Sequence, residues 1–193
     1  MKIVQKLEAD LNSSIEAKKS LIKKKKNIFE AITIIYSAIK NKKKIFLCGN
    51  GGSAADAQHL SAEYIDRLRP KINRKPLPLL SLALDTSHLT ACSNDFNFDQ
   101  VFSRPLRALG SSGDVLICIS TSGNSKNILN VLKLAKKMRI KTISFLGKKG
   151  GIAKKYSKTN IIVDSENVAR IQEAHIFLGH FVLEVVENKL FNK

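Results

Sequence analysis

The sequence predicts a three-layer α/β sandwich: a five-stranded parallel sheet flanked by helices, of the flavodoxin-like or Rossmann-like kind. Two observations lead to this prediction. Short apolar segments alternate along the chain with longer segments whose apolar residues recur every three or four positions, which is the pattern of strands alternating with helices. The short segments are apolar throughout rather than at every second residue, so helices should cover both faces of the sheet.

The N-terminal part of the chain is predicted to be helical. Apolar residues from Ile3 to Ile39 are spaced by three and four, which favours one or two amphipathic helices. We expect this extension, about residues 1–42, to serve in oligomerisation. Neither a repeat nor a linker interrupts the sequence, so residues 1–193 are expected to form a single domain.

The remaining elements follow in chain order. Residues 45–49 should form a buried strand, and a helix should begin near Ser53, whose hydroxyl suits an N-cap or first-turn position. The polar, proline-containing segment 67–78 is predicted to be a loop. The other expected elements are a strand at 79–85, a helix and turn at 86–96, a helix at 99–110, a strand at 115–120, a helix at 126–138, strands at 141–147 and 160–164, and a helix from about Val168 to Leu190.

Composition is typical of a soluble globular protein. Hydrophobic residues make up 44% of the chain and charged residues 25%. The sequence has no apolar run long enough to span a bilayer and no secretory signal pattern near Met1. We therefore expect no membrane partner and a cytoplasmic location. Cys48, Cys92 and Cys118 are widely spaced, which favours reduced, buried thiols over a disulfide framework.

The net charge of +17 raises the question of nucleic-acid binding. The lysines gather near expected helix ends and in connections, and aromatic residues for base stacking are not interleaved with them. A solvated basic surface is the favoured interpretation, and we expect no nucleic-acid partner.

Two polar loops follow strands of the predicted sheet, at residues 49–53 and 120–125. Both should lie at the carboxyl edge, where ligands bind in open α/β sheets. The second loop places the hydroxyls of Ser120, Thr121, Ser122 and Ser125 around a helix start, where backbone N–H groups and the helix dipole favour an anion. Helix capping is the alternative function of such residues, but four hydroxyls in six positions favour phosphate binding.

The sequence also distinguishes between a dinucleotide, a nucleoside triphosphate and a smaller phosphate as the ligand of these loops. The first loop fits a relaxed dinucleotide fingerprint, with Gly49, Gly51 and Ala54, but that pattern also needs an acidic residue about 20 positions later. Asp85 comes about ten positions too late for this role. A triphosphate-binding loop needs a lysine, which this loop lacks. A small monophosphate fits better than either.

Candidate acid–base and metal-binding residues lie on two expected helices. His59 and Glu63 are four positions apart and share a helix face, so Glu63 could act as general base, metal ligand or both. Gln172, His175 and His180 interrupt an apolar helix, and such polar residues destabilise a core unless they are paired. Ordinary alternatives are a surface His–Glu pair and a core histidine.

Helix geometry separates two of these residues. Gln172 and His180 are eight positions apart, or about 12 Å along a helix. Metal–ligand bonds of about 2 Å cannot bring both to one metal from a single straight helix. If both serve one site, a neighbouring subunit supplies one of them, and a fully active monomer would contradict this hypothesis.

Taken together, these segments resemble the phosphoheptose (sedoheptulose 7-phosphate) isomerases of the sugar-isomerase, or SIS, domain superfamily. The resemblance covers about residues 3–190 and depends on CGNGGSAADAQH, SAEY, SNDF, FSR, GDVLICISTSGNS and ARIQEAH. It implies a homotetramer with active sites between subunits and one zinc ion per subunit.

The resemblance also implies residue roles. Glu63 and His180 would be the acid–base pair. Zinc would be bound by His59, Glu63, Gln172 and His180, and it would polarise the substrate carbonyl. The substrate would be bound by Asn50, Gly51, Gly52, Ser53, Glu63, Asn94, Asp95, Ser120, Thr121, Ser122, Ser125 and Gln172.

The implied reaction converts D-sedoheptulose 7-phosphate to D-glycero-D-manno-heptose 7-phosphate through an enediolate, as the first step of heptose synthesis for lipopolysaccharide or capsule. Two positions depart from the family pattern: Asp66 and Ser93 stand where glycine is usual. The alternative is a non-catalytic SIS protein that binds the replication initiator or senses a sugar phosphate. That branch lacks the residues corresponding to Glu63 and His180, so their presence favours an enzyme.

Overall fold

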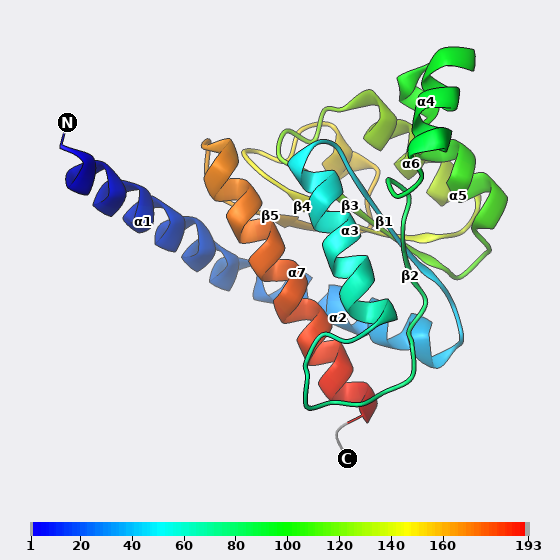
Figure 1. The fold of residues 1–193 in the computed structure, drawn as a ribbon, viewed down its shortest axis with the longest axis horizontal. Helices are drawn as coiled ribbons and strands as arrows, with labels where there is room; N and C mark the ends of the chain where they lie inside the picture. Colours follow the sequence, from blue (N-terminus) through cyan, green and yellow to red (C-terminus); the bar gives the residue numbers. More distant parts are fainter. Residues whose placement is uncertain (1, 192–193) are drawn as a thin grey trace.

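The computed structural model describes residues 2–191, and its sheet is parallel and five-stranded, as predicted (Figure 1). Residues 1 and 192–193 of the predicted single domain lie outside the described part. The strands lie in the order β2-β1-β3-β4-β5, so the order reverses between β1 and β3, which is where ligands bind in such sheets. They are β1 (Ile45–Gly49), β2 (Leu79–Ser81), β3 (Val115–Ser120), β4 (Lys141–Leu146) and β5 (Thr159–Ile162).

Helices cover both faces of the sheet, which confirms the three-layer prediction. One core joins the sheet to α2, α3 and α7, and a second core joins it to α4, α5 and α6. The helices are α1 (Ile3–Lys19), η1 (Ser20–Lys24), α2 (Lys25–Lys40), α3 (Gly52–Ile65), α4 (Thr86–Asp95), η2 (Phe98–Gln100), α5 (Ser103–Leu109), α6 (Lys126–Lys137), η3 (Ala153–Lys155) and α7 (Val168–Phe191).

Strand β1 is apolar throughout because it contributes to both cores. Ile45 and Leu47 of β1 pack in the core with α2, α3 and α7, whereas Phe46 and Cys48 pack in the core with α4, α5 and α6. This follows from the two-residue repeat of a strand, which sends successive side chains to opposite faces.

Two predicted boundaries were wrong. The predicted strand 79–85 ends at Ser81, whose Oγ accepts a hydrogen bond from Ala83 N (3.2 Å) and so turns the chain out of the sheet. The predicted helix 99–110 begins only at Ser103, after the separate turn η2. Pro105 accounts for this difference, because proline fits the first turn of a helix but not its interior.

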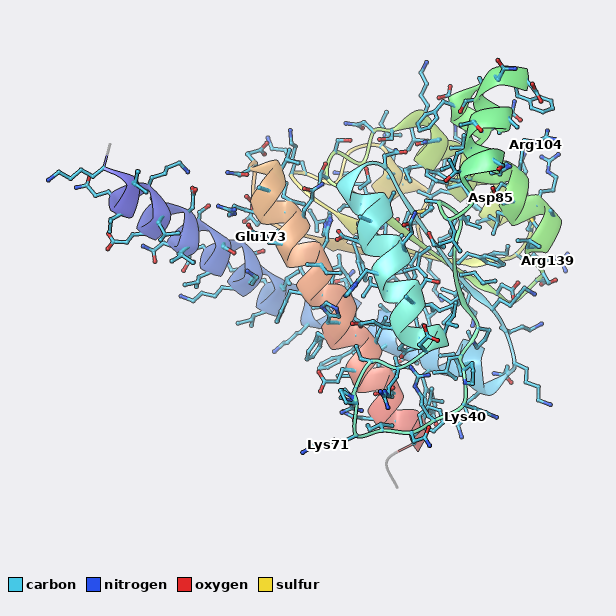
Figure 2. All side chains as sticks on the ribbon, viewed as in Figure 1. Lys40, Lys71, Asp85, Arg104, Arg139 and Glu173 are labelled. Atoms are coloured by element: carbon cyan, nitrogen blue, oxygen red, sulfur yellow. The ribbon has the colours of Figure 1, made fainter. Side chains whose placement is uncertain are left out.

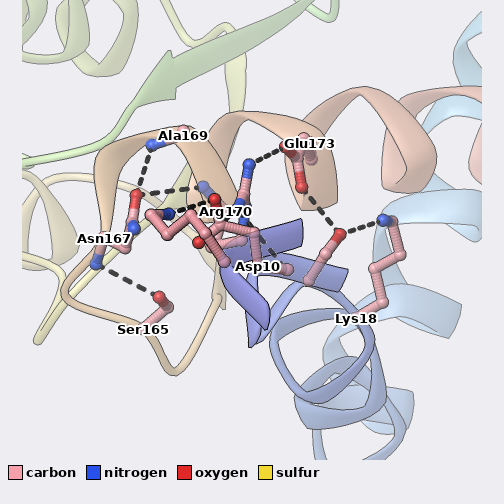
Figure 3. A network of polar contacts seen from close by, with 9 residues as sticks. Asp10, Lys18, Ser165, Asn167, Ala169, Arg170 and Glu173 are labelled. Carbon is pink, nitrogen blue, oxygen red and sulfur yellow. Dashed lines mark hydrogen bonds and ion pairs between the residues drawn. The ribbon is translucent and has the colours of Figure 1, made fainter. Parts of the chain in front are cut away.

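Helix α1 extends away from the rest of the molecule (Figure 1). A polar network joins it to the start of α7 (Figure 3): Arg170 lies between Asp10 and Glu173, and Ser14 Oγ donates to Glu173 Oε2 (2.7 Å). Lys18 Nζ in turn donates to Ser14 Oγ (2.6 Å). The apolar face of α1 is left exposed, including Ile3, Leu7, Leu11 and Ile15.

The three cysteines are buried and free of disulfides, as predicted. Cys48 and Cys118 are paired across β1 and β3, with their Sγ atoms 3.4 Å apart. Burial raises the pKa of the Cys118 thiol, which keeps it protonated and poorly nucleophilic.

Basic side chains occur on more than one part of the surface. Lys40 and Lys71 lie at the lower end of the molecule in Figure 2, whereas Arg104 and Arg139 lie on its right-hand side. None of the helices within residues 2–191 is both long and apolar enough to cross a membrane.

His175 is a core residue. Its side chain is fully buried, and neither ring nitrogen has a well-formed hydrogen bond among the described residues. Burial lowers the pKa of His175 to about 4, although the nearby backbone of Leu146 acts in the opposite direction. The folded protein therefore holds His175 as the neutral imidazole near pH 7.

We predict that His175 makes folding sensitive to acid. The unfolded chain binds a proton at His175 near pH 6.5, whereas the folded chain resists this until about pH 4. The free energy of unfolding should therefore fall as the pH drops through this window, by up to roughly 3 kcal/mol from this group. Urea denaturation at pH 7 and pH 4.5 should show a smaller fall for His175→Leu than for the unmodified chain. Equal falls would contradict the prediction.

Candidate functional site

The two polar loops meet at the point where the strand order reverses. Gly49 at the end of β1 is in register with Ile119 of β3, so both loops leave the sheet side by side. They enclose a cavity of about 60 Å³, which suits one phosphate group and is far smaller than the roughly 300–1,000 Å³ of larger ligand pockets. Its lining residues are Asn50, Ser53, Ile119, Ser120, Thr121, Ser122, Ser125 and Gln172.

The first loop presents the N-terminus of α3 to this cavity. Gly51 is the N-cap, and its φ of 55° lies in the left-handed region that glycine adopts without strain. Ser53 follows in the first turn, as predicted, and its side chain is buried. The positive end of the helix dipole favours an anion here.

The serines of the second loop are not simply helix caps. Ser125 occupies the N-cap position of α6 but makes no side-chain capping hydrogen bond. Ser120 Oγ accepts from Gly123 N (3.1 Å), and Ser122 Oγ accepts from Asn124 N (3.2 Å). A hydroxyl that accepts one hydrogen bond can still donate its own proton, so these side chains can bind phosphate oxygens.

A buried pair of amides joins the two loops. Asn50 Nδ2 donates to Asn127 Oδ1 (2.9 Å), and Asn127 Nδ2 donates back to Asn50 Oδ1 (2.8 Å). Sequence reasoning missed Asn127, which is almost completely buried at the start of α6. The sequence did offer a signal for Asn127: it is an asparagine in the first helical turn after the serine loop, on an otherwise apolar helix face.

Gln172 reaches this cavity from α7. Its Nε2 lies 2.7 Å from where a Cβ on Gly52 would be, so only glycine allows this close approach. The structure thus brings the predicted residues Asn50, Gly52, Ser53 and Gln172 together with the serine loop.

His59, Glu63 and His180 form a second cluster, on neighbouring faces of α3 and α7. His59 Nε2 lies 2.9 Å from His180 Nε2, and the two oxygens of Glu63 lie 3.3 Å from His59 Nε2 and 3.4 Å from His180 Nε2. The helices are tightly packed at this level, since a Cβ on Gly179 would lie 2.5 Å from Leu60 Cδ1. The cluster is partly exposed, with Glu63 the least accessible of its three side chains.

The cluster fits a metal ion. Its three donor atoms lie within 4.8 Å of one another. Bonds of about 2.1 Å in a tetrahedral site place ligand atoms about 3.4 Å apart, which is close to the 2.9–3.4 Å found here. Glu63 Oε2 is buried without a hydrogen-bond partner among the described residues. Two imidazoles and a carboxylate are a common donor set for zinc.

Asp56 is a further acidic residue beside the cluster that sequence reasoning missed. It lies one turn before His59 on α3, and its Oδ2 is buried without a hydrogen-bond partner in the described chain. Burial raises the pKa of the Asp56 carboxyl, and the charges of His59 and His180 partly offset this. Its position three residues before His59, on the same helix face, was the signal that could have found it.

Gln172, Asn94 and Asp95 are predicted site residues that lie apart from the His59–Glu63–His180 cluster. Gln172 lies at the phosphate-sized cavity, while His180 lies at the cluster; this is the separation expected from their spacing along one helix. Asn94 and Asp95 are exposed at the end of α4, where Asn94 Nδ2 donates to Asp95 Oδ1 (3.0 Å). Neither lines the cavity in this chain, and their part in substrate binding stays a prediction.

Comparison with known proteins gives a consistent picture. The sequence pattern of the SIS domain matches residues 11–147. The phosphoheptose isomerase of Clostridium acetobutylicum is 47% identical over 190 residues, which is 97% of this chain and 96% of that protein. The structure of a phosphoheptose isomerase from Neisseria gonorrhoeae matches with a TM-score of 0.90 at 38% identity, over 97% of this chain and all of that one.

A second solved structure agrees. A phosphoheptose isomerase from Francisella tularensis matches with a TM-score of 0.92 at 31% identity, again over 97% of this chain and all of that one. The similarity therefore includes both loops and both helices that carry the candidate site. On this evidence, the chain belongs to the phosphoheptose isomerase family of SIS-domain proteins.

Proposed function

We propose that this chain is an aldose–ketose isomerase that converts D-sedoheptulose 7-phosphate to D-glycero-D-manno-heptose 7-phosphate. The observation that carries the proposal is the carboxylate of Glu63 held between two imidazoles, in a chain that also forms a phosphate-sized cavity. A protein that only sensed a sugar phosphate would need the cavity but not the acid–base groups.

Glu63 is the proposed base for the carbon-bound proton. Conversion of the ketose to the aldose moves one proton from C1 to C2 through an enediolate. A single carboxylate can take the proton from C1 and return it to C2, because the two carbons are adjacent. The free Oε2 of Glu63, which lacks a hydrogen-bond partner among the described residues, is suited to this transfer.

His180 is the proposed carrier of the oxygen-bound proton, which moves from O1 to O2 in the same reaction. The imidazole suits this role because its ordinary pKa lies near neutral pH. His180 presents Nε2 to the cluster, and one nitrogen cannot bind a metal and carry a proton at the same moment. The two roles proposed for His180 therefore alternate.

Zinc is the proposed metal, held by His59, Glu63 and His180 and completed by the partner subunit's Gln172. When bound, it supplies a positive charge that polarises the substrate carbonyl and stabilises negative charge on oxygen. The phosphate group would occupy the serine loop, so that its binding energy positions the reacting carbons.

The proposed assembly is a homotetramer with active sites between subunits. An apolar groove of about 430 Å³ lies between η1, α2 and α7, and Phe29, Phe177 and Phe181 on its walls are exposed. The apolar face of α1 is exposed as well, and exposed apolar surfaces of this kind often mark protein–protein contacts. We also propose a cytoplasmic location, because phosphorylated sugars do not cross membranes unaided.

We predict that Glu63→Gln and His180→Ala each reduce turnover of sedoheptulose 7-phosphate by roughly 100-fold or more, because general acid–base catalysis contributes about 10²–10⁴-fold. Binding of inorganic phosphate should be unchanged, because the serine loop is intact. Product formation followed by NMR and phosphate binding by calorimetry measure the two effects. Unaltered turnover in both variants would refute the assigned roles.

Removal of metal should abolish activity and be reversible. Dialysis against a strong chelator should remove the metal and, with it, the turnover of sedoheptulose 7-phosphate. Added Zn²⁺ should restore turnover, since the cluster offers His and carboxylate donors. In His59→Ala, the metal content after purification should drop and added Zn²⁺ should restore little activity. Full activity in a chelated sample shown by elemental analysis to lack metal would contradict the zinc proposal.

Shared active sites predict complementation between inactive subunits. Consider a mixed oligomer of Glu63→Gln and Gln172→Ala chains, in which each site takes Glu63 from one chain and Gln172 from a neighbour. Each contributing chain carries the needed residue in about half of the cases, so up to about a quarter of the sites are intact. Unfolding and refolding the two variants together should therefore restore activity that neither shows alone. Sites formed within single chains would give no recovery, and this result would overturn the composite site.

A further inference from the structure

Loop 66–78 carries a buried arginine at the end of α3. The side chain of Arg74 is only 1% exposed, although it lies in a polar connection between α3 and β2. A guanidinium is costly to remove from water unless each of its N–H groups finds a partner. The partners of Arg74 therefore indicate what the loop does.

Arg74 occupies the C-terminal end of α3. Its two terminal nitrogens donate to the backbone oxygens of Glu63 and Tyr64, each at 2.9 Å. The last carbonyls of a helix lack partners within the helix and carry partial negative charge, and α3 has no basic residue in its own last turn. Arg74 supplies the positive charge and donates to two of these carbonyls, one of which is the carbonyl of Glu63 itself.

The same guanidinium is tied to α7. Arg74 Nε donates to Glu187 Oε1 at 2.6 Å, and the Glu187 side chain is fully buried. The other oxygen of Glu187 accepts from Arg69 Nε at 2.8 Å. Arg74 thus bridges the end of α3 and the body of α7, while Arg69 contacts α7 without reaching the carbonyls of α3.

The bridge lies close to the His59–Glu63–His180 cluster. Glu187 follows His180 by seven residues, or two helical turns, and so projects from nearly the same face of α7. A second tie joins the same helices, because Tyr64 Oη donates to Leu183 O (2.7 Å). The Tyr64 ring lies under the guanidinium, 5.3 Å from ring centroid to Arg74 Cζ.

We infer that Arg74 is a positioning residue for the active site, which holds Glu63 on α3 and His180 on α7 at the separation at which their side chains meet. It touches neither substrate nor metal. Its effect on turnover rests on the proposed isomerase function, whereas its effect on metal binding does not.

Arginine is required here because of its shape. One planar fork reaches Glu187, the Glu63 carbonyl and the Tyr64 carbonyl at once. The single ammonium of lysine keeps the charge beside Glu187 but cannot make all three bonds in this geometry. Arg74→Lys should therefore preserve the buried ion pair and the fold while releasing the end of α3.

The test compares Arg74→Lys with the matched control Arg69→Lys, because Arg69 belongs to the same loop and binds the same carboxylate of Glu187. In Arg74→Lys, we expect kcat for sedoheptulose 7-phosphate to fall about 10- to 100-fold, with little change in KM. The dissociation constant of Co²⁺, followed by its visible absorption, should rise about 10-fold or more. Arg69→Lys should change each quantity by less than about threefold, because Arg69 makes no bond to α3.

Circular dichroism and size-exclusion chromatography establish that each variant is folded and assembled. A folded Arg74→Lys with unaltered Co²⁺ affinity would overturn the inference, as would equal effects in the Arg69→Lys control. If the unmodified protein fails to turn over sedoheptulose 7-phosphate, the proposed function fails, and the Co²⁺ affinities still decide the role of Arg74.

A second variant covers the case in which Arg74→Lys does not fold. Tyr64→Phe removes only the hydroxyl tie to Leu183 and keeps the ring, so the core stays packed. Weaker Co²⁺ binding in this variant supports a positioning role for the contact between α3 and α7. A Co²⁺ affinity equal to that of the unmodified protein overturns this positioning role.

Discussion

The close packing of α3 against α7 is the constraint on which the rest of the site depends. At one end, Gln172 lies against Gly52 beside the phosphate-sized cavity. In the middle, the side chain of Leu60 packs against Gly179, where a larger residue would leave no room for it. Towards the other end, the Tyr64 hydroxyl reaches the backbone of α7. Because packed helices shift as rigid units, the separation of these two helices determines both the width of the cavity and the geometry of the His59–Glu63–His180 cluster.

The two parts of the site have different physical origins. The cavity arises from the sheet, since parallel strands β1 and β3 deliver two helix N-termini to one edge, and the positive ends of the helix dipoles favour an anion there. The His59–Glu63–His180 cluster arises from helix faces further along α3 and α7, where side chains rather than backbone supply the chemistry. A sugar phosphate combines both requirements, because its phosphate binds at one place while its carbonyl carbons react at another.

Much of the fold was predictable because local and global signals agree. The five strands and the helices between them follow from apolar periodicity, and the serine loop follows from four hydroxyls after a buried strand. The misplaced boundaries have local causes: Pro105 delays α5, and the Ser81 side chain bends the chain away from the sheet. Asn127 and Asp56 were missed because their importance depends on partners 77 residues away in the first case and on α7 in the second.

The sequence by itself determined the fold class, the phosphate loops and the residue types of the candidate site, since each depends on short-range pattern. It also determined that Gln172 and His180 are separated by about 12 Å along one helix, because helix rise is constant. Only the tertiary structure decided which of the two joins His59 and Glu63, and that Arg74 holds the end of α3 against Glu187. The contacts that His59 and Arg74 make with α7 join residues more than 100 positions apart, and their geometry depends on how whole helices pack rather than on any local pattern.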